Sequence, residues 1–87
     1  MHWLYILRCA DSSLYIGETT DLELRILRHN EGRGCAFTAS RLPVALAYSE
    51  SHDDRESALR RERQLKRWTC AKKEALIAGD LVALKRL

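Results

Sequence analysis

Hydrophobic positions near the amino terminus fall in two short runs, residues 2–9 and 13–18, separated by the polar turn Ala10-Asp11-Ser12-Ser13. Runs of this length, bounded by turn residues, predict two β-strands joined by a tight hairpin. Side chains alternate between the two faces of a strand, so the pattern places Tyr5 and Tyr15 where the hairpin can bring their phenols together. Two neighbouring hydroxyls can position a water, a metal or a phosphate, although buried tyrosines also simply fill space.

A helical pattern follows the hairpin. The segment Thr20-Asp21-Leu22-Glu23 matches a capping box with Thr20 as the N-cap. We expect a helix from there to about Asn30 or Glu31, ended by the glycines of Gly32-Arg33-Gly34. Its core-facing side chains are expected to be Leu22, Ile26 and Leu27.

The middle of the chain reads as a loop and then a third strand. Small and polar residues from Cys35 to Arg41 predict the loop, and Val44–Tyr48 follows Pro43 as an apolar run. Proline fits only the start of a strand or an edge. His52-Asp53-Asp54 is expected to stop this strand, and Asp53 is the expected N-cap of the next helix, which should run to about Trp68.

The carboxy-terminal part reads as helical. Thr69 can cap a helix that runs to about Ala78 and is stopped by Gly79, and Asp80 can cap a last short turn. The element order is therefore β-β-α-β-α-α. It predicts an α/β protein of the α+β type, in which helices flank a three-stranded, mainly antiparallel sheet, with residues 1–87 forming one domain.

Composition narrows the class of protein. Of 87 residues, 46% are hydrophobic, and no apolar run approaches the roughly 20 residues that a membrane-spanning helix needs. The first residues lack the basic start and long apolar segment of a secretory signal, so we expect a cytoplasmic protein without membrane contact. The three cysteines are far apart and form no zinc-binding or thioredoxin-like pair.

The formal net charge is +3, and basic residues concentrate in the segment 55–73. A basic helical region suits a phosphate backbone, although such a run is often only a solvated helix surface. The residues of this segment expected to bind nucleic acid are Arg61, Lys66, Arg67 and Lys72.

Two of the predicted helices carry polar residues that could take part in catalysis or ligand binding. Arg25 and His29 are four residues apart and share a helix face, where a guanidinium could pair with Asp21 or reach a phosphate. Glu62 falls inside the apolar stripe of the later helix, between Leu59 and Leu65. A carboxylate in that position needs a partner, and both a salt bridge to an arginine and a divalent metal fit the pattern.

The ordered set Tyr5, Tyr15, Gly17, Arg25, His29 and Glu62 resembles the GIY-YIG nuclease family, in particular its small stand-alone bacterial members. Tyr15-Ile16-Gly17 matches the second family motif, and Trp3-Leu4-Tyr5 stands at the first. Arg25 and His29 match the helical motif, and Ala58-Leu59-Arg60-Arg61-Glu62 matches the segment around the metal-binding glutamate. The family includes homing endonucleases, restriction enzymes and the incision subunit of bacterial DNA nucleotide excision repair.

The resemblance implies a Mg²⁺- or Mn²⁺-dependent endonuclease that hydrolyses phosphodiester bonds in nucleic acid, with DNA as the favoured substrate. Glu62 would hold the metal, and Tyr5 and Tyr15 would orient the attacking water. Arg25 would stabilise charge on the phosphoryl oxygens, and His29 would bind the phosphate or orient a tyrosine. Gly17 would lie at the nucleic acid beside them.

The chain departs from the family pattern at three points. Trp3 replaces the glycine of the first motif, Glu18 stands where many members have lysine, and no late asparagine is present. The alternative function is therefore a nucleic-acid-binding module of the same fold with little or no catalysis, and a protein-interaction domain is a weaker alternative. A domain this small also predicts recognition of DNA shape, such as branches and ends, more than of sequence.

Overall fold

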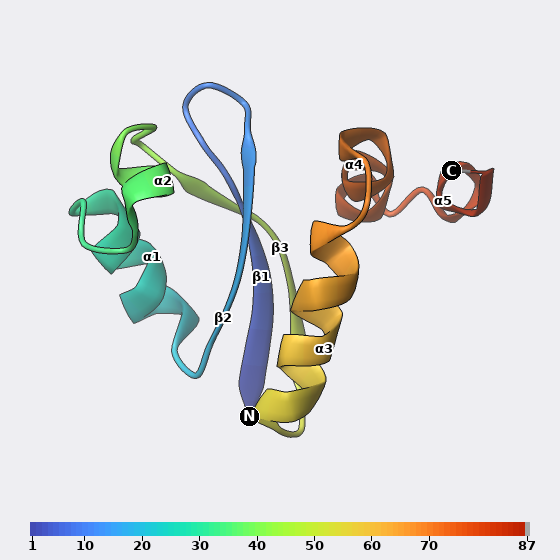
Figure 1. The fold of residues 1–87 in the computed structure, drawn as a ribbon, viewed down its shortest axis with the longest axis horizontal. Helices are drawn as coiled ribbons and strands as arrows, with labels where there is room; N and C mark the ends of the chain where they lie inside the picture. The colour runs from blue at the N-terminus through green and yellow to red at the C-terminus, as the bar shows by residue number, and fades with distance from the viewer. Residues whose placement is uncertain (87) are drawn as a thin grey trace.

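The computed structural model describes residues 1–86 and has an α+β fold (Figure 1). Its elements are β1 (His2–Arg8), β2 (Leu14–Thr19), α1 (Leu22–Asn30), α2 (Ala36–Ala39), β3 (Ala45–His52), α3 (Arg55–Lys66), α4 (Cys70–Ala78) and α5 (Leu81–Arg86). The sheet order is β2-β1-β3, and both pairings are antiparallel. The predicted fold class is therefore confirmed.

β1 is the central strand and is covered on both faces. Four consecutive residues, Leu4 to Leu7, are fully buried, because helices pack against each side of the sheet. Leu4 and Ile6 pack with Ile16 of β2 and Leu65 of α3, whereas Tyr5 and Leu7 pack on the opposite face with residues of α1. Figure 1 shows α1 and α2 on one side of the sheet and α3 on the other.

β2 lies at one edge of the sheet and pairs on one side only. Its register places Tyr5 opposite Gly17 and Leu7 opposite Tyr15. Tyr5, Tyr15 and Gly17 consequently lie on the same face, as the alternation in sequence predicts. This register brings both tyrosines to the side of the sheet on which α1 packs.

The helix caps differ from two of the sequence predictions by one residue. Asp21 caps α1 by accepting from the backbone N–H of Leu24, so the prediction of Thr20 as N-cap is wrong. Asp54, and not Asp53, caps α3 by accepting from the backbone N–H of Ser57. In both places two adjacent residues can act as a cap, and the local backbone decides which one does.

The carboxy-terminal predictions hold at both caps of α4. Thr69 accepts from the backbone N–H of Lys72, and Gly79 ends the helix with a left-handed φ of 71°. Asp80 accepts from the backbone N–H of Ala83 at the start of α5. Glycine adopts a positive φ without steric cost, which explains why the helix ends there.

β3 covers Ala45–His52 and ends where the sequence predicts, and α3 ends at Lys66, close to the predicted end at about Trp68. Two further predictions are wrong. The predicted loop from Cys35 to Arg41 contains the short helix α2. Leu27 is 55% exposed because it lies on the outer face of α1, away from Leu22 and Ile26. Among residues 1–86, no helix is both long and apolar enough to cross a membrane.

Candidate active site

Tyr5 lies at the centre of the candidate site. Its side chain is fully buried on the central strand, and its hydroxyl passes over Gly17 of the neighbouring strand. A Cβ on residue 17 would lie 2.6 Å from Tyr5 Cζ, closer than any real contact, so only glycine leaves room for the ring. The presence of glycine at position 17 of the Tyr15-Ile16-Gly17 motif is therefore explained by steric contact with Tyr5 and does not depend on a ligand.

Two residues of α1 contact the Tyr5 hydroxyl. Arg25 Nε donates to Tyr5 Oη at 3.3 Å, and His29 Nε2 lies 3.1 Å from the same oxygen. Their spacing of four residues places them one turn apart on one helix face. Arg25 is thus directed toward a phenol and does not pair with Asp21, whose carboxylate caps the helix.

The hydrogen bonds of His29 define its tautomer. His29 is fully buried, and its Nδ1 lies 2.8 Å from Thr38 Oγ1, which itself donates to the Cys35 carbonyl oxygen. Because the threonine has one proton to donate, its hydroxyl accepts from Nδ1–H, and this assignment leaves Nε2 as an acceptor for the Tyr5 proton. The result is a directed chain in which Arg25 donates to Tyr5, Tyr5 to His29, and His29 to Thr38.

A second glycine makes room for the histidine. A Cβ on Gly34 would lie 2.5 Å from the Cε1 and Cγ atoms of His29. Gly34 belongs to the segment that the sequence predicts as a helix terminator. The structure gives this position a steric role beside the imidazole as well.

Burial controls the protonation of the central groups. The pKa of His29 lies below its ordinary value because of burial and then the nearby Arg25 guanidinium, so the imidazole is neutral at pH 7. Burial raises the pKa of Tyr5, and Arg25 opposes that shift only in part. Both the tyrosine and the histidine are therefore uncharged in the resting site.

Tyr15 lies beside this chain of hydrogen bonds. Its ring centroid is 6.4 Å from that of Tyr5 and 5.2 Å from that of His29. Burial, followed by the hydrogen bond to Cys35, raises the pKa of Tyr15 to about 12. Burial alone would raise the pKa of the Cys35 thiol, but hydrogen bonds with Thr38, with Tyr15 and with the Phe37 backbone lower it overall.

Glu62 approaches the site from the other side of the sheet. Its side chain is 16% exposed and forms an ion pair with Lys66, with 3.4 Å between Nζ and Oε1. The partner is thus a lysine one turn later, not an arginine. Glu62 forms no hydrogen bond with the two tyrosines, Arg25 or His29 in the described part of the chain, but its charge contributes to the raised pKa of Tyr5.

The donor set suits a hard divalent cation that the substrate helps to bind. Residues 1–86 contain no group of three or more His, Cys, Asp or Glu side chains that could enclose a metal. Mg²⁺ is commonly held by one or two carboxylates, with waters and substrate phosphates completing the shell. Glu62 together with a phosphate and waters fits that pattern.

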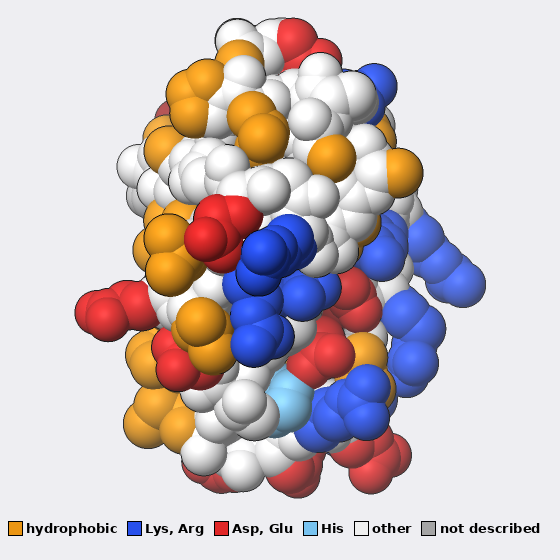
Figure 2. Space-filling model, turned by 90° about the vertical axis from the view of Figure 1, so that its left-hand side faces the viewer, with side chains coloured by type: hydrophobic (Ala, Val, Ile, Leu, Met, Phe, Trp, Pro, Cys, Tyr) orange, Lys and Arg blue, Asp and Glu red, His pale blue; other side chains and the backbone are white. Residues whose placement is uncertain are grey.

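Arg25 opens into a polar hollow of about 460 Å³ beside β2. Arg28, Arg55, Glu18 and His2 line the same hollow. Figure 2 shows basic side chains gathered on this face, with acidic side chains and a histidine among them. The carboxylate of Glu18 contacts His2 and lies 3.6 Å from Arg55 Nε, so its negative charge is compensated within the protein.

The predicted nucleic-acid-binding residues have different surroundings. Arg61 donates to Glu50 and Gln64, and both Arg61 and Lys72 lie over the Trp68 ring. Lys66 is exposed beside Glu62, and Arg67 is exposed with Arg60 and Arg63 along a separate hollow. Lys66 is therefore the member of this set with a direct contact to a candidate catalytic residue.

Sequence reasoning missed the residues that support the histidine. Thr38, which is fully buried, and Cys35 belong to the segment interpreted as a loop, and no periodic pattern marks them. Asn30 also has a structural role, because its side-chain amide donates to and accepts from the backbone of Val44. In the sequence, only the second glycine of Gly32-Arg33-Gly34 indicates close packing at this place, because a single glycine suffices to end a helix.

Comparisons with known proteins found relatives that cover most of this chain. A UPF0213 protein of Natronomonas pharaonis is 42% identical over 91% of this chain and 93% of its own length, and one of Staphylococcus saprophyticus is 44% identical over 88% and 94%. The solution NMR structure of the UPF0213 protein BH0048 from Bacillus halodurans superposes with a TM-score of 0.59 at 38% identity, covering 91% of this chain and 84% of that one. The family model described as the GIY-YIG catalytic domain matches residues 1–75. Because that match spans both tyrosines, the α1 pair and Glu62, we conclude that this chain belongs to the GIY-YIG family.

Proposed function

We propose that this protein is a metal-dependent endonuclease that hydrolyses phosphodiester bonds in DNA. The observation that carries the proposal is the placement of Tyr5 Oη between Arg25 Nε, at 3.3 Å, and His29 Nε2, at 3.1 Å. A phenol held between a fixed cation and a neutral imidazole has a hydrogen-bond donor on one side and a proton acceptor on the other, the arrangement that a proton relay requires. Membership of a nuclease family supports the choice of reaction.

The protein side chains have separate roles in this mechanism. Arg25, which lines the polar hollow, binds a nonbridging phosphate oxygen and stabilises the charge that grows on it. Tyr15 orients the attacking water from the partly exposed side. When bound at Glu62, Mg²⁺ or Mn²⁺ supplies charge stabilisation to the phosphate and to the leaving oxygen.

Because the pKa of Tyr5 is raised, its hydroxyl is protonated at neutral pH before the reaction begins. A relay removes this difficulty: Tyr5 Oη takes the proton of the water as its own proton passes to His29 Nε2. The water oxygen then forms its bond to phosphorus, the bond to the leaving oxygen breaks, and a solvent proton neutralises that oxygen. The low pKa of His29 keeps the imidazole free to accept the proton in the resting enzyme.

The test is cleavage of a panel of single-stranded, duplex and branched DNA and RNA with Mg²⁺, with Mn²⁺ and with a chelator. We expect Arg25→Ala and Glu62→Gln each to lower the rate by at least about 10²-fold. The matched controls are Arg33→Ala and Glu56→Gln, which change exposed residues after α1 and on α3. Equal rates for the site variants and the controls, or cleavage that persists in chelator, would refute the proposal.

A binding module without catalysis is the second candidate. The observation that favours it is that Glu62, the proposed metal ligand, is paired with Lys66 and forms no hydrogen bond with Tyr5, Tyr15 or Arg25 within residues 1–86. Such a module would bind nucleic acid with an affinity that falls steeply with salt and would give no product with either metal. The same panel therefore separates the two candidates.

A further inference from the structure

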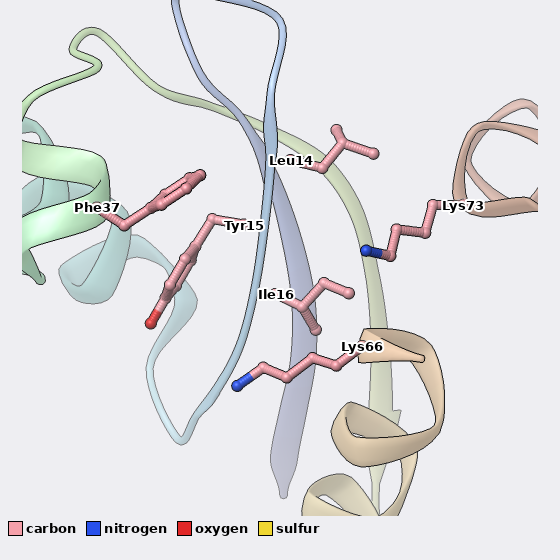
Figure 3. A pocket seen from close by; sticks show the side chains of 6 residues that line it. All are labelled: Leu14, Tyr15, Ile16, Phe37, Lys66 and Lys73. Carbon is pink, nitrogen blue, oxygen red and sulfur yellow. The ribbon is translucent and has the colours of Figure 1, made fainter. Parts of the chain in front are cut away.

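A small apolar pocket lies along the free edge of β2, next to the candidate active site (Figure 3). It has a volume of about 210 Å³ and is lined by Leu14, Tyr15, Ile16, Phe37, Lys66 and Lys73. Because β2 is an edge strand, the pocket can extend past it and join residues that pack on opposite faces of the sheet. Tyr15 and Phe37 come from one side, and the two lysines come from α3 and α4 on the other.

One wall of the pocket is aromatic. The Tyr15 and Phe37 rings are nearly parallel, with an interplanar angle of 28° and centroids 6.1 Å apart. Phe37 remains 39% exposed, although the Arg41 guanidinium covers one face of its ring at 3.9 Å from the centroid. Leu14 and Ile16 supply an apolar floor between this wall and the lysines. An aromatic and aliphatic lining of this kind suits a flat, unsaturated ring.

The other wall is cationic. Figure 3 shows the Lys66 side chain extended across β2 toward the side on which Tyr15 lies, with Lys73 above it. Lys66 Nζ lies 3.4 Å from Glu62, and Lys73 takes part in no ion pair within residues 1–86. An apolar pocket rimmed by two ammonium groups has the charge and shape of a site for an aromatic ring attached to phosphates.

The pocket is continuous with the candidate active site. Tyr15 contributes both to the pocket and to the aromatic cluster around His29, and Lys66 contacts the proposed metal ligand. Its volume of about 210 Å³ is below the roughly 300–1,000 Å³ of pockets for drug-sized ligands. The space therefore fits one planar heterocycle and not a whole nucleotide.

We propose that this pocket holds a single unstacked nucleobase, from a nucleotide adjoining the scissile phosphate, while Lys66 and Lys73 bind the phosphates beside it. The inference rests on the proposed nucleic-acid substrate but not on catalysis. A base inside a continuous duplex cannot reach the pocket, so the occupant is either part of an unpaired strand or a base rotated out of a duplex.

The binding test uses the full chain with a chelator, so that no cleavage occurs. The probe is a short thymidine oligonucleotide that contains one 2-aminopurine, whose fluorescence falls when it stacks on an aromatic ring. We expect quenching with the parent protein, little quenching with Phe37→Leu, and recovery with Phe37→Trp. Leu24→Ala, at a residue of similar exposure (41%) on α1, is the control and should quench like the parent.

Competition with unlabelled oligonucleotides measures the contribution of the base. Loss of one base–aromatic stacking contact typically weakens binding by roughly 5- to 150-fold, so an oligonucleotide with an abasic site in place of the purine should compete that much less well. With Phe37→Leu, the two competitors should become equivalent. Lys73→Ala should weaken binding of both oligonucleotides and leave this ratio unchanged.

Comparison of single-stranded and duplex probes shows whether the bound base comes from an unpaired strand or is rotated out of a duplex. Quenching of single-stranded probe but not of paired probe assigns the pocket to unpaired strands, and quenching of a mismatched duplex as well assigns it to rotated bases. Equal competition by the intact and abasic oligonucleotides with the parent protein would overturn the inference. Quenching without cleavage by any metal would retain the pocket and refute the endonuclease instead.

Discussion

The phenol of Tyr5 occupies the space in which a side chain on residue 17 would lie, and the imidazole of His29 does the same at residue 34. The hydrogen bonds from Arg25 and to Thr38 then fix both rings. Single residues thus contribute to the site in two ways, by polar contact and by leaving room. A sequence motif identifies the residues that form the polar contacts. The space that Gly17 and Gly34 leave for the two rings can be recognised only in the folded structure.

Gly17→Ala tests the steric contribution. The added methyl group would lie 2.6 Å from Tyr5 Cζ, so the ring must move, and we expect a loss of about 1–3 kcal/mol in the free energy of unfolding. Urea denaturation measures this loss. Repeating the change in a Tyr5→Ala background should remove most of the cost, because the ring that it meets is gone. Equal costs in the two backgrounds would show that the clash is not with Tyr5.

The pKa of His29 predicts how stability depends on pH. Its folded-state pKa lies below the unfolded value of about 6.5, so the unfolded chain binds more protons between the two values. This contribution to stability is fully present above about pH 6.5 and decreases as the pH falls toward the folded pKa. We expect His29→Gln to lose less stability than the parent between about pH 7.5 and 5.5. Parallel stability curves for the two proteins would contradict the assignment.

At the scale of elements, the helix caps are determined by one residue each. Asp54→Ala should lower the free energy of unfolding by about 0.5–2 kcal/mol, because its carboxylate accepts from the Ser57 N–H at the start of α3. Asp53→Ala, one residue earlier, should change it by less than about 0.5 kcal/mol. Urea unfolding of both variants is the measurement, and a larger loss for the Asp53 variant would contradict the observed cap.

The sequence predicted long, periodic elements better than short ones. The hairpin, the presence of α1 and α3, and both ends of α4 follow from alternation, helical spacing and capping residues, which are local properties of the chain. α2 has only four residues and no apolar period, so the sequence predicts a loop there. Thr38 was missed for the same reason, since its burial depends on the position of His29 and not on its neighbours in sequence.

At the scale of the whole molecule, the sheet separates two sets of site residues. Tyr5, Arg25 and His29 pack on the α1 face, whereas α3 brings Glu62 to the other face, and the edge strand β2 lies between them. The family resemblance could assign all of them to one site. It did not include the pairing of Glu62 with Lys66, a contact one helical turn apart within α3 that the spacing of the two residues permits.

The net charge of +3 predicts that nucleic-acid binding weakens as salt rises. A plot of the logarithm of affinity against the logarithm of salt concentration should be linear, and Lys73→Ala should reduce its slope by about one unit. Lys85→Ala, at an exposed position on α5, should leave the slope unchanged. A slope that responds equally to both variants would indicate diffuse attraction instead of contacts at the β2 edge.

The crowding at positions 17 and 34 also affects how relatives are classified. One extra carbon at either place would displace a ring while every polar side chain of the site remained in the sequence. Consider a homologue with alanine at one of these two positions. It could still have both tyrosines, the arginine, the histidine and the glutamate, so a comparison of the polar site residues alone would classify it as active. We expect such a protein to be inactive. The two glycines should therefore be considered together with the polar site residues when active members of the family are distinguished from inactive ones.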